Sequence, residues 1–203
     1  MATTAAPYGL KPVKRADGMP YAGATSQYLI DPAGEGTNLF YGQVVHIGAD
    51  GYIALSTATG ADGTTNAFPT GTTLTGSLGV FVGCEYTNSS GQLVQAQYYP
   101  SATAGGVIKA YVVDDPNVLF QVQADGAMDQ SDIGANTFFP AAQSTSTGST
   151  TTGNSNSAVD ATTVTTTAAF RIVSAVSPIG DAFPDLLVKF NPGYSSATNA
   201  VGL

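Results

Sequence analysis

Short apolar runs recur along the whole chain, and each is bounded by turn-forming residues. The runs are QYLI (27–30), LFYGQVVHI (39–47), YIAL (52–55), LGVFVGCEY (78–86), LVQAQYY (93–99), VIKAYVV (107–113), VLFQVQA (118–124), AFRIVSAV (169–176) and DLLVKF (185–190). Several alternate with period two, so that Val118, Phe120 and Val122 share one face of an extended chain. Nine such runs predict an all-β protein, an antiparallel barrel or sandwich of about nine short strands.

Turn signals and composition agree with this fold class. The tripeptide Ala-Asp-Gly occurs four times, at 16–18, 49–51, 61–63 and 124–126. Asp-Gly tolerates the positive φ of tight hairpins, and the segments 46–53 and 88–91 each predict one. Only eight residues are Glu, Lys or Arg, so long helices are not expected. At most one short helix is predicted, a turn in 130–136 with Asp129 or Ser131 as its cap.

The first 21 residues carry a charge opposite to that of the rest of the chain. They hold Lys11, Lys14 and Arg15 against one acid, whereas the remainder holds three cations against thirteen acids. The segment is also rich in proline and shows no helical periodicity. We therefore expect residues 1–25 to form an extended arm that binds a partner, because such a charge split acts on association more than on folding.

The rest of the chain predicts one body, residues 26–192. Within it, residues near 143–167 are a low-complexity stretch, with Ser or Thr at fifteen of the 24 positions from 144 to 167. A flexible linker is one interpretation. The β-branched threonines favour a long exposed loop that turns into an edge strand. Residues 193–203 form a small, polar C-terminal tail.

Residues suited to catalysis are sparse. His46 is the only histidine and Cys84 the only cysteine. A lone strand histidine gives no sign of a catalytic triad, and the two residues cannot supply a zinc site. We interpret His46 as partly exposed or hydrogen-bonded, and Cys84 as a buried thiol that packs as a small apolar residue. The protein is predicted not to be an enzyme and to bind no cofactor.

Two groups of aspartates make a structural Ca²⁺ site an alternative to consider. Asp125, Asp129 and Asp132 are close in sequence, and Asp114-Asp115 precedes a Pro-Asn pair, but neither group has the spacing of an EF-hand loop. The alternative, which we favour, is that they accept backbone N–H bonds in turns. An acidic chain is a poor partner for nucleic acid, and no apolar stretch is long enough to span a membrane.

Five segments together resemble a known family. They are APYGLKPV (6–13), NLFYGQVV (38–45), GVFVG (79–83), AFRIV (169–173) and GDAFPDLLVKFN (180–191). In their order and spacing they resemble the capsid decoration, or cement, proteins of tailed bacteriophages, and the resemblance spans nearly the full length. Members of that family usually end soon after the last of these segments, whereas this chain continues.

The resemblance implies a virion protein that binds the outer surface of the phage head and clamps neighbouring major capsid subunits. An extended arm can add a strand to a sheet edge of its partner, here with Tyr8 and Leu10 as apolar anchors. The residues expected to contact the capsid are Pro7, Tyr8, Gly9, Leu10, Lys11, Val13, Lys14 and Arg15.

We expect a homo-dimer or trimer at a local symmetry axis of the capsid, made and assembled in the host cytoplasm. One alternative is a head fibre, a knob or another receptor-facing β-protein, whose Ser/Thr-rich loop would contact the host. A more distant alternative is a carbohydrate-binding module or enzyme.

Overall fold

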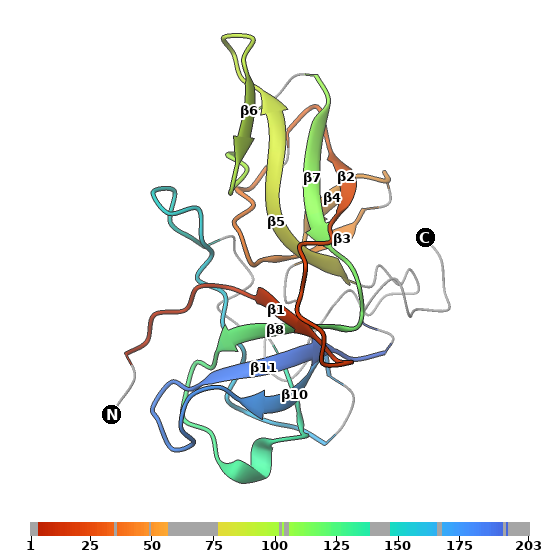
Figure 1. Ribbon diagram of the computed structural model, residues 1–203. Helices are drawn as coiled ribbons and strands as arrows, with labels where there is room; N and C mark the ends of the chain where they lie inside the picture. Colours follow the sequence, from red (N-terminus) through yellow and green to blue (C-terminus); the bar gives the residue numbers. More distant parts are fainter. Residues whose placement is uncertain are drawn as a thin grey trace.

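The computed structural model describes residues 4–34, 36–48, 50–56, 77–101, 103, 106–138, 147–165, 168–192 and 194. This part of the chain is all-β (Figure 1), and its only helical element is a 3-10 turn, η1 (Gln130–Asp132). The strands are β1 (Lys11–Arg15), β2 (Ser26–Ile30), β3 (Val44–Ile47), β4 (Ile53–Leu55), β5 (Ser77–Thr87), β6 (Leu93–Ala96), β7 (Ile108–Val113), β8 (Val118–Gln123), β9 (Asn136–Thr137), β10 (Phe170–Ala175) and β11 (Asp185–Phe190).

The strands form two antiparallel sheets. The five-stranded sheet has the order β1-β8-β11-β10-β9, and the six-stranded sheet has the order β2-β7-β5-β3-β4, with β6 also paired to β5. The six-stranded sheet lies above the five-stranded sheet in Figure 1. The predicted all-β class is confirmed, and the architecture is sandwich-like and not a closed barrel. Strands β1 and β9 lie outside the nine predicted runs.

Two buried clusters of apolar side chains form the core. The lower core comprises Leu10, Val44, Val80, Val113, Val118, Phe120, Val122, Ala124, Met128, Val159, Ala169, Phe170, Ile172, Leu186, Val188 and Phe190. The upper core comprises Ile30, Leu39, Val45, Ile53, Leu55, Phe81, Cys84, Tyr99, Ile108, Ala110 and Val112. With a single cysteine, the chain cannot form an internal disulfide, so the burial of these clusters is what stabilises the fold.

Strands β3, β5 and β7 separate the two cores, and the parts of these strands that lie between the cores are buried on both faces. Each carries neighbouring residues that point to opposite cores. These pairs, with the lower-core residue first, are Val44 and Val45, Val80 and Phe81, and Val113 and Val112. A strand that is buried on both faces has adjacent apolar residues in place of an apolar–polar alternation. We call this layer of β3, β5 and β7 the shared wall.

The described part of the predicted arm belongs to the body. Strand β1 pairs with β8, from Lys11 opposite Gln121 to Arg15 opposite Val118. Leu10 is fully buried in the lower core. The extended segment therefore adds a strand to a sheet of its own chain, which corrects the expectation of an arm free to extend onto a partner.

Two glycine backbones cross where this segment meets the shared wall. The Leu10 N–H donates to the Gly42 carbonyl, and the Gly42 N–H donates to the Phe81 carbonyl, both at 2.9 Å. Gly9 and Gly42 both have a φ of 85°. A Cβ on Gly42 would lie 2.8 Å from the Gly9 Cα, closer than carbon atoms approach. The crossing therefore requires glycine, and it lets Leu10 reach the lower core.

The Ser/Thr-rich stretch, predicted to be a long exposed loop that turns into an edge strand, combines exposed and buried residues in its described part. In its described part, residues 147–165, isolated bridges join Asn154 to Tyr41 and Val159 to Ala124. The side chains of Ser155 and Val159 are fully buried. This stretch therefore fills space beside both sheets, and its described residues form no edge strand.

Two local predictions of turn structure are confirmed. Gly51 has a φ of 82° in the hairpin between β3 and β4, and Gly91 has a φ of 79° in the hairpin between β5 and β6. The helical turn is present with Asp129 as its N-cap, although η1 is shorter than the predicted segment 130–136. The Asp129 N–H donates to the Asp132 carboxylate at 2.8 Å, which closes this turn.

Replacing Gly42 with alanine tests the glycine crossing. Gly42→Ala adds a Cβ into the Gly9 backbone at a positive φ, and we expect it to lower the free energy of unfolding by about 3 kcal/mol or more. Gly51→Ala is the matched control, because Gly51 has a similar φ but no atom within 4 Å of the added Cβ. It should cost about 1 kcal/mol. Urea unfolding monitored by circular dichroism measures both, and equal losses would contradict the close approach.

Candidate functional site

The N-terminal segment lies across the outer face of the five-stranded sheet. The Ala6 N–H donates to the Gln123 side-chain oxygen at 2.8 Å, and the Gln123 amide donates back to the Thr4 carbonyl at 3.2 Å. The Tyr8 hydroxyl donates to the Asp185 carboxylate at 3.0 Å. Burial and the Asp185 charge raise the pKa of Tyr8, so this hydroxyl keeps its proton. The segment is thus held on the body by side-chain bonds as well as by β1.

The eight predicted capsid-contact residues differ widely in exposure. Gly9 and Leu10 are buried, so Leu10 cannot anchor on a partner as expected. Pro7, Tyr8, Val13 and Arg15 are partly buried, whereas Lys11 and Lys14 are exposed. The two lysines are therefore the most exposed members of the set.

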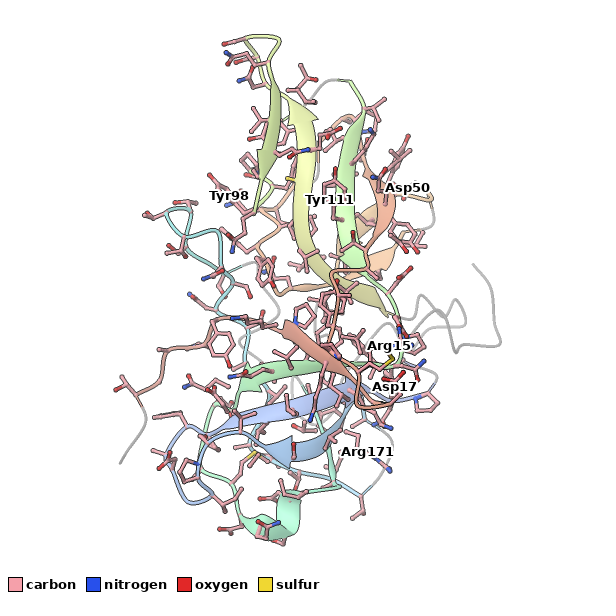
Figure 2. The ribbon with its side chains drawn as sticks, viewed as in Figure 1. Arg15, Asp17, Asp50, Tyr98, Tyr111 and Arg171 are labelled. Carbon is pink, nitrogen blue, oxygen red and sulfur yellow. The ribbon has the colours of Figure 1, made fainter. Side chains whose placement is uncertain are left out.

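Arg15 is already engaged within the chain. Its guanidinium lies 2.6 Å from the Asp115 carboxylate and 3.3 Å from that of Asp17 (Figure 2). The outer edge of β1 is also occupied, because the Arg15 N–H donates to the Met19 carbonyl and the Tyr21 N–H to the Val13 carbonyl. A partner strand therefore cannot pair with this half of β1.

An open cleft lies where the N-terminal segment meets the outer face of the six-stranded sheet, and we call it the junction cleft. Its volume is about 900 Å³. It is lined by Tyr8, Lys11, Tyr41, Val82, Gly83, Cys84, Gln95, Ala96, Gln97, Tyr111, Gln121 and Asn154. The lining thus joins β1, β5, β6, β7 and β8, and Figure 2 shows Tyr111 on β7. Of the predicted contact residues, Tyr8 and Lys11 line this cleft.

Two charged groups outside the lining position several of its side chains. Asp185 accepts from Tyr8 and, at 3.3 Å, from the Gln121 amide. At the rim, Glu85 accepts from Gln95 at 3.1 Å and from Lys109 at 3.2 Å. Hydrogen bonds from Gln95 and Lys109 hold the pKa of Glu85 below its usual value. Both carboxylates are therefore satisfied by the protein and act to orient cleft side chains.

Cys84 and His46 are poorly suited to nucleophilic or acid–base chemistry. Burial raises the pKa of the Cys84 thiol to about 12, and its sulfur donates to the Tyr98 carbonyl at 3.4 Å. The predicted buried thiol is confirmed, at 1% exposure. His46 is partly buried, with its Nδ1 3.4 Å from the Ser56 hydroxyl, and burial lowers its pKa. It is therefore neutral at pH 7.

The aspartates that suggested a metal site are engaged in protein hydrogen bonds. Asp125 accepts from the Ala161 N–H, and Asp132 accepts from the Thr163 hydroxyl at 2.7 Å. Asp114 accepts from the hydroxyls of Ser26 and Tyr28. Within the ranges that the structure covers, no three His, Cys, Asp or Glu side chains are grouped to hold a metal ion.

The described residues also contain no helix with the length and apolar character needed to cross a membrane. Comparison with known proteins gives no match: no family model, no curated protein and no solved structure corresponds to this chain.

The junction cleft was not predicted from the sequence. Its lining comes from positions between 8 and 154, so no local motif contains it. One partial signal was present: the polar residues of the QAQ and QVQ runs, at Gln95, Gln97, Gln121 and Gln123, are amides and not charges. Three of these four glutamines, Gln95, Gln97 and Gln121, line the cleft.

The bond between Tyr8 and Asp185 predicts how the N-terminal segment is held. Tyr8→Phe removes one charge-assisted hydrogen bond between residues 177 positions apart, and we expect amide exchange of Gly9 and Leu10 to accelerate about tenfold. Tyr21→Phe is the control, because the one partner of the Tyr21 hydroxyl among the described residues is the nearby Ala24 carbonyl. Hydrogen exchange followed by NMR measures both variants; unchanged exchange in Tyr8→Phe would show that the bond does not hold the segment.

Thiol labelling tests the environment of Cys84. With a pKa of about 12 and almost no exposure, the thiol should not react with a disulfide reagent at pH 8 in the folded protein. The same protein in urea should react fully within minutes. Rapid labelling under native conditions would mean that β5 and β6 separate readily near the cleft.

Proposed function

We propose that the protein is a non-enzymatic decoration protein of a tailed-bacteriophage head, which binds the outer capsid surface and clamps neighbouring major capsid subunits. It would act as a dimer or trimer at a local symmetry axis, where several weak contacts per assembly add up through avidity. Its role is mechanical: it bridges adjacent subunits and so opposes the pressure of packaged DNA.

One observation supports this proposal most. The five segments that carry the resemblance are spread from residue 6 to residue 191, yet each contributes to the lower core. Their members in this core are Leu10, Val44, Val80, Ala169, Phe170, Ile172, Leu186, Val188 and Phe190. Segments that meet in one core describe a single structural framework. A resemblance that extends over the whole chain requires such a framework, and this arrangement of the segments supports the proposal.

The surface chemistry favours binding through charge. Lys11 and Lys14 are exposed on a chain of net charge −8, on the strand that also carries Arg15. Because Leu10 is used internally, the contact with the capsid would depend on these lysines, opposite acidic capsid positions. The histidine and cysteine environments described above favour binding over catalysis as well.

Charge reversal at the two lysines tests the proposal. Purified protein is mixed with expanded capsids that lack it, and binding is measured by co-sedimentation and by cryo-electron microscopy. We expect wild-type protein to saturate lattice sites and Lys11→Glu/Lys14→Glu to bind about tenfold more weakly at physiological salt. Lys189→Glu is the control, because Lys189 lies on β11 of the same sheet but outside the predicted contact.

These substitutions are a sharper test than deletion of the N-terminal segment. Deletion would remove β1 and the buried Leu10, so a loss of binding could reflect unfolding. If wild-type protein does not bind capsids, the proposal is wrong. If it gathers at a vertex or on the tail and does not follow the lattice, the receptor-facing alternative replaces it.

A further inference from the structure

The lining of the junction cleft differs in chemistry from the chain as a whole. The protein has fourteen acidic residues and a net charge of −8, yet the twelve lining residues include no carboxylate and one cation, Lys11. The rest of the polar lining is three tyrosines, three glutamines and one asparagine. We propose that this cleft binds an oligosaccharide that contains an acidic sugar. The proposal goes beyond capsid binding and does not depend on it.

The hydrogen-bonding capacity of the cleft suits a ligand rich in hydroxyl groups. Amide and phenol groups both donate and accept, as vicinal sugar hydroxyls do. The Gln97 amide donates to the Asn154 oxygen at 2.6 Å, which leaves the Gln97 oxygen and the Asn154 NH₂ for a ligand. The Tyr41 hydroxyl makes no hydrogen bond among the described residues, although Tyr41 is partly buried.

The cleft also provides aromatic surfaces on which the C–H faces of a sugar ring can pack. A sugar ring has polar edges and two C–H faces, which pack against aromatic rings. Tyr8, Tyr41 and Tyr111 each combine an aromatic face with a polar tip. A purely apolar ligand would need a more hydrophobic lining than this one.

The one cation of the cleft lining, Lys11, favours a ligand with a negative charge. Lys11 is exposed and has no ion-pair partner among the residues that the structure describes. The two carboxylates that contact lining side chains already accept hydrogen bonds from the protein. Glu85 accepts from Gln95, Lys109 and Tyr111, and Asp185 accepts from Tyr8 and Gln121. A carboxylate on a uronic or sialic acid unit would pair with Lys11. A nucleic acid strand would need a row of cations in the groove, which the lining does not provide.

Several lining side chains are held in place before any ligand binds. Asp185 fixes Tyr8 and Gln121, Glu85 fixes Gln95, and Asn154 fixes Gln97. Side chains that are already ordered lose little conformational entropy on binding, which favours affinity.

Glycan binding by the free protein tests the proposal. A glycan array of acidic and neutral oligosaccharides gives the first screen. NMR titrations then use two matched pairs, trigalacturonate with its methyl ester and sialyllactose with lactose. We expect binding to acidic members, with shifts at Tyr41, Gln97, Tyr111 and Asn154, and about threefold weaker binding to the neutral member of each pair. No binding on the array and no cleft shifts at millimolar ligand would overturn the proposal.

Two variants separate the ring contact from the charge contact. Tyr111→Ala should weaken binding about tenfold or more to acidic and neutral glycans alike. Lys11→Gln should weaken binding only to acidic glycans, about threefold, and Lys11→Arg should restore it. Tyr52→Ala and Lys189→Gln are controls outside the cleft. If Lys11→Gln affects neutral and acidic glycans equally, the assignment of an acidic sugar is wrong.

The same variants keep this proposal distinct from capsid binding. Lys14 does not line the cleft, so Lys14→Glu should weaken capsid binding and leave glycan affinity unchanged. Tyr111→Ala should weaken glycan binding and leave capsid binding unchanged. A thermal melt of each variant verifies that it is folded. The glycan titrations contain no capsids, and the capsid-binding assay contains no glycan. Each proposal can therefore fail without affecting the test of the other.

Discussion

The rest of the structure depends on one constraint: the parts of β3, β5 and β7 that lie between the two cores are buried on both faces. Adjacent residues of these strands, such as Val44 and Val45 or Val80 and Phe81, face opposite cores. A shift of one residue in register would exchange the two sets of side chains and disturb both cores at once. The two sheets therefore cannot be treated as independent lobes, and we expect the described body to unfold as one cooperative unit.

The extended N-terminal segment shows what charge patterning does and does not reveal. The excess of cations in residues 1–21 indicated association, and charge alone cannot distinguish a partner molecule from a sheet of the same chain. The structure gives the segment an internal role, because Arg15 pairs with Asp115 and Leu10 fills the lower core. Lys11 and Lys14 are what remains for an external partner. Of the eight residues predicted to contact the capsid, these two lysines are the ones with exposed side chains.

Local sequence signals predicted most of the strands. The pairing of β1 and the packing of the N-terminal segment and the Ser/Thr-rich stretch depend on contacts between distant residues. Period-two runs and Asp-Gly turns were sufficient to predict the all-β class, but they did not predict that β3, β5 and β7 lie between two cores. The pairing of β1 with β8 depends on the glycine crossing at Gly9 and Gly42, which no local pattern reveals. The burial of Ser155 and the Tyr8–Asp185 bond are also contacts between segments distant in sequence. Composition alone therefore does not show which residues of the Ser/Thr-rich stretch are buried.

The junction cleft follows from the way the shared wall extends past the five-stranded sheet. Along the outer face of β5 and its partner β7, Val80 and Val113 lie in the lower core, Gly83 and Tyr111 line the cleft, and Glu85 and Lys109 form the rim. One continuous sheet face thus passes from core to cleft to solvent, and the irregular pairing between Phe81 and Gly83 marks the change. A cleft built on strands anchored in both cores has a rigid wall, so its ligand need not order the backbone on binding. The exposed side chains of the cleft lie outside both cores. Their chemistry can therefore suit a ligand with little effect on the stability of the fold.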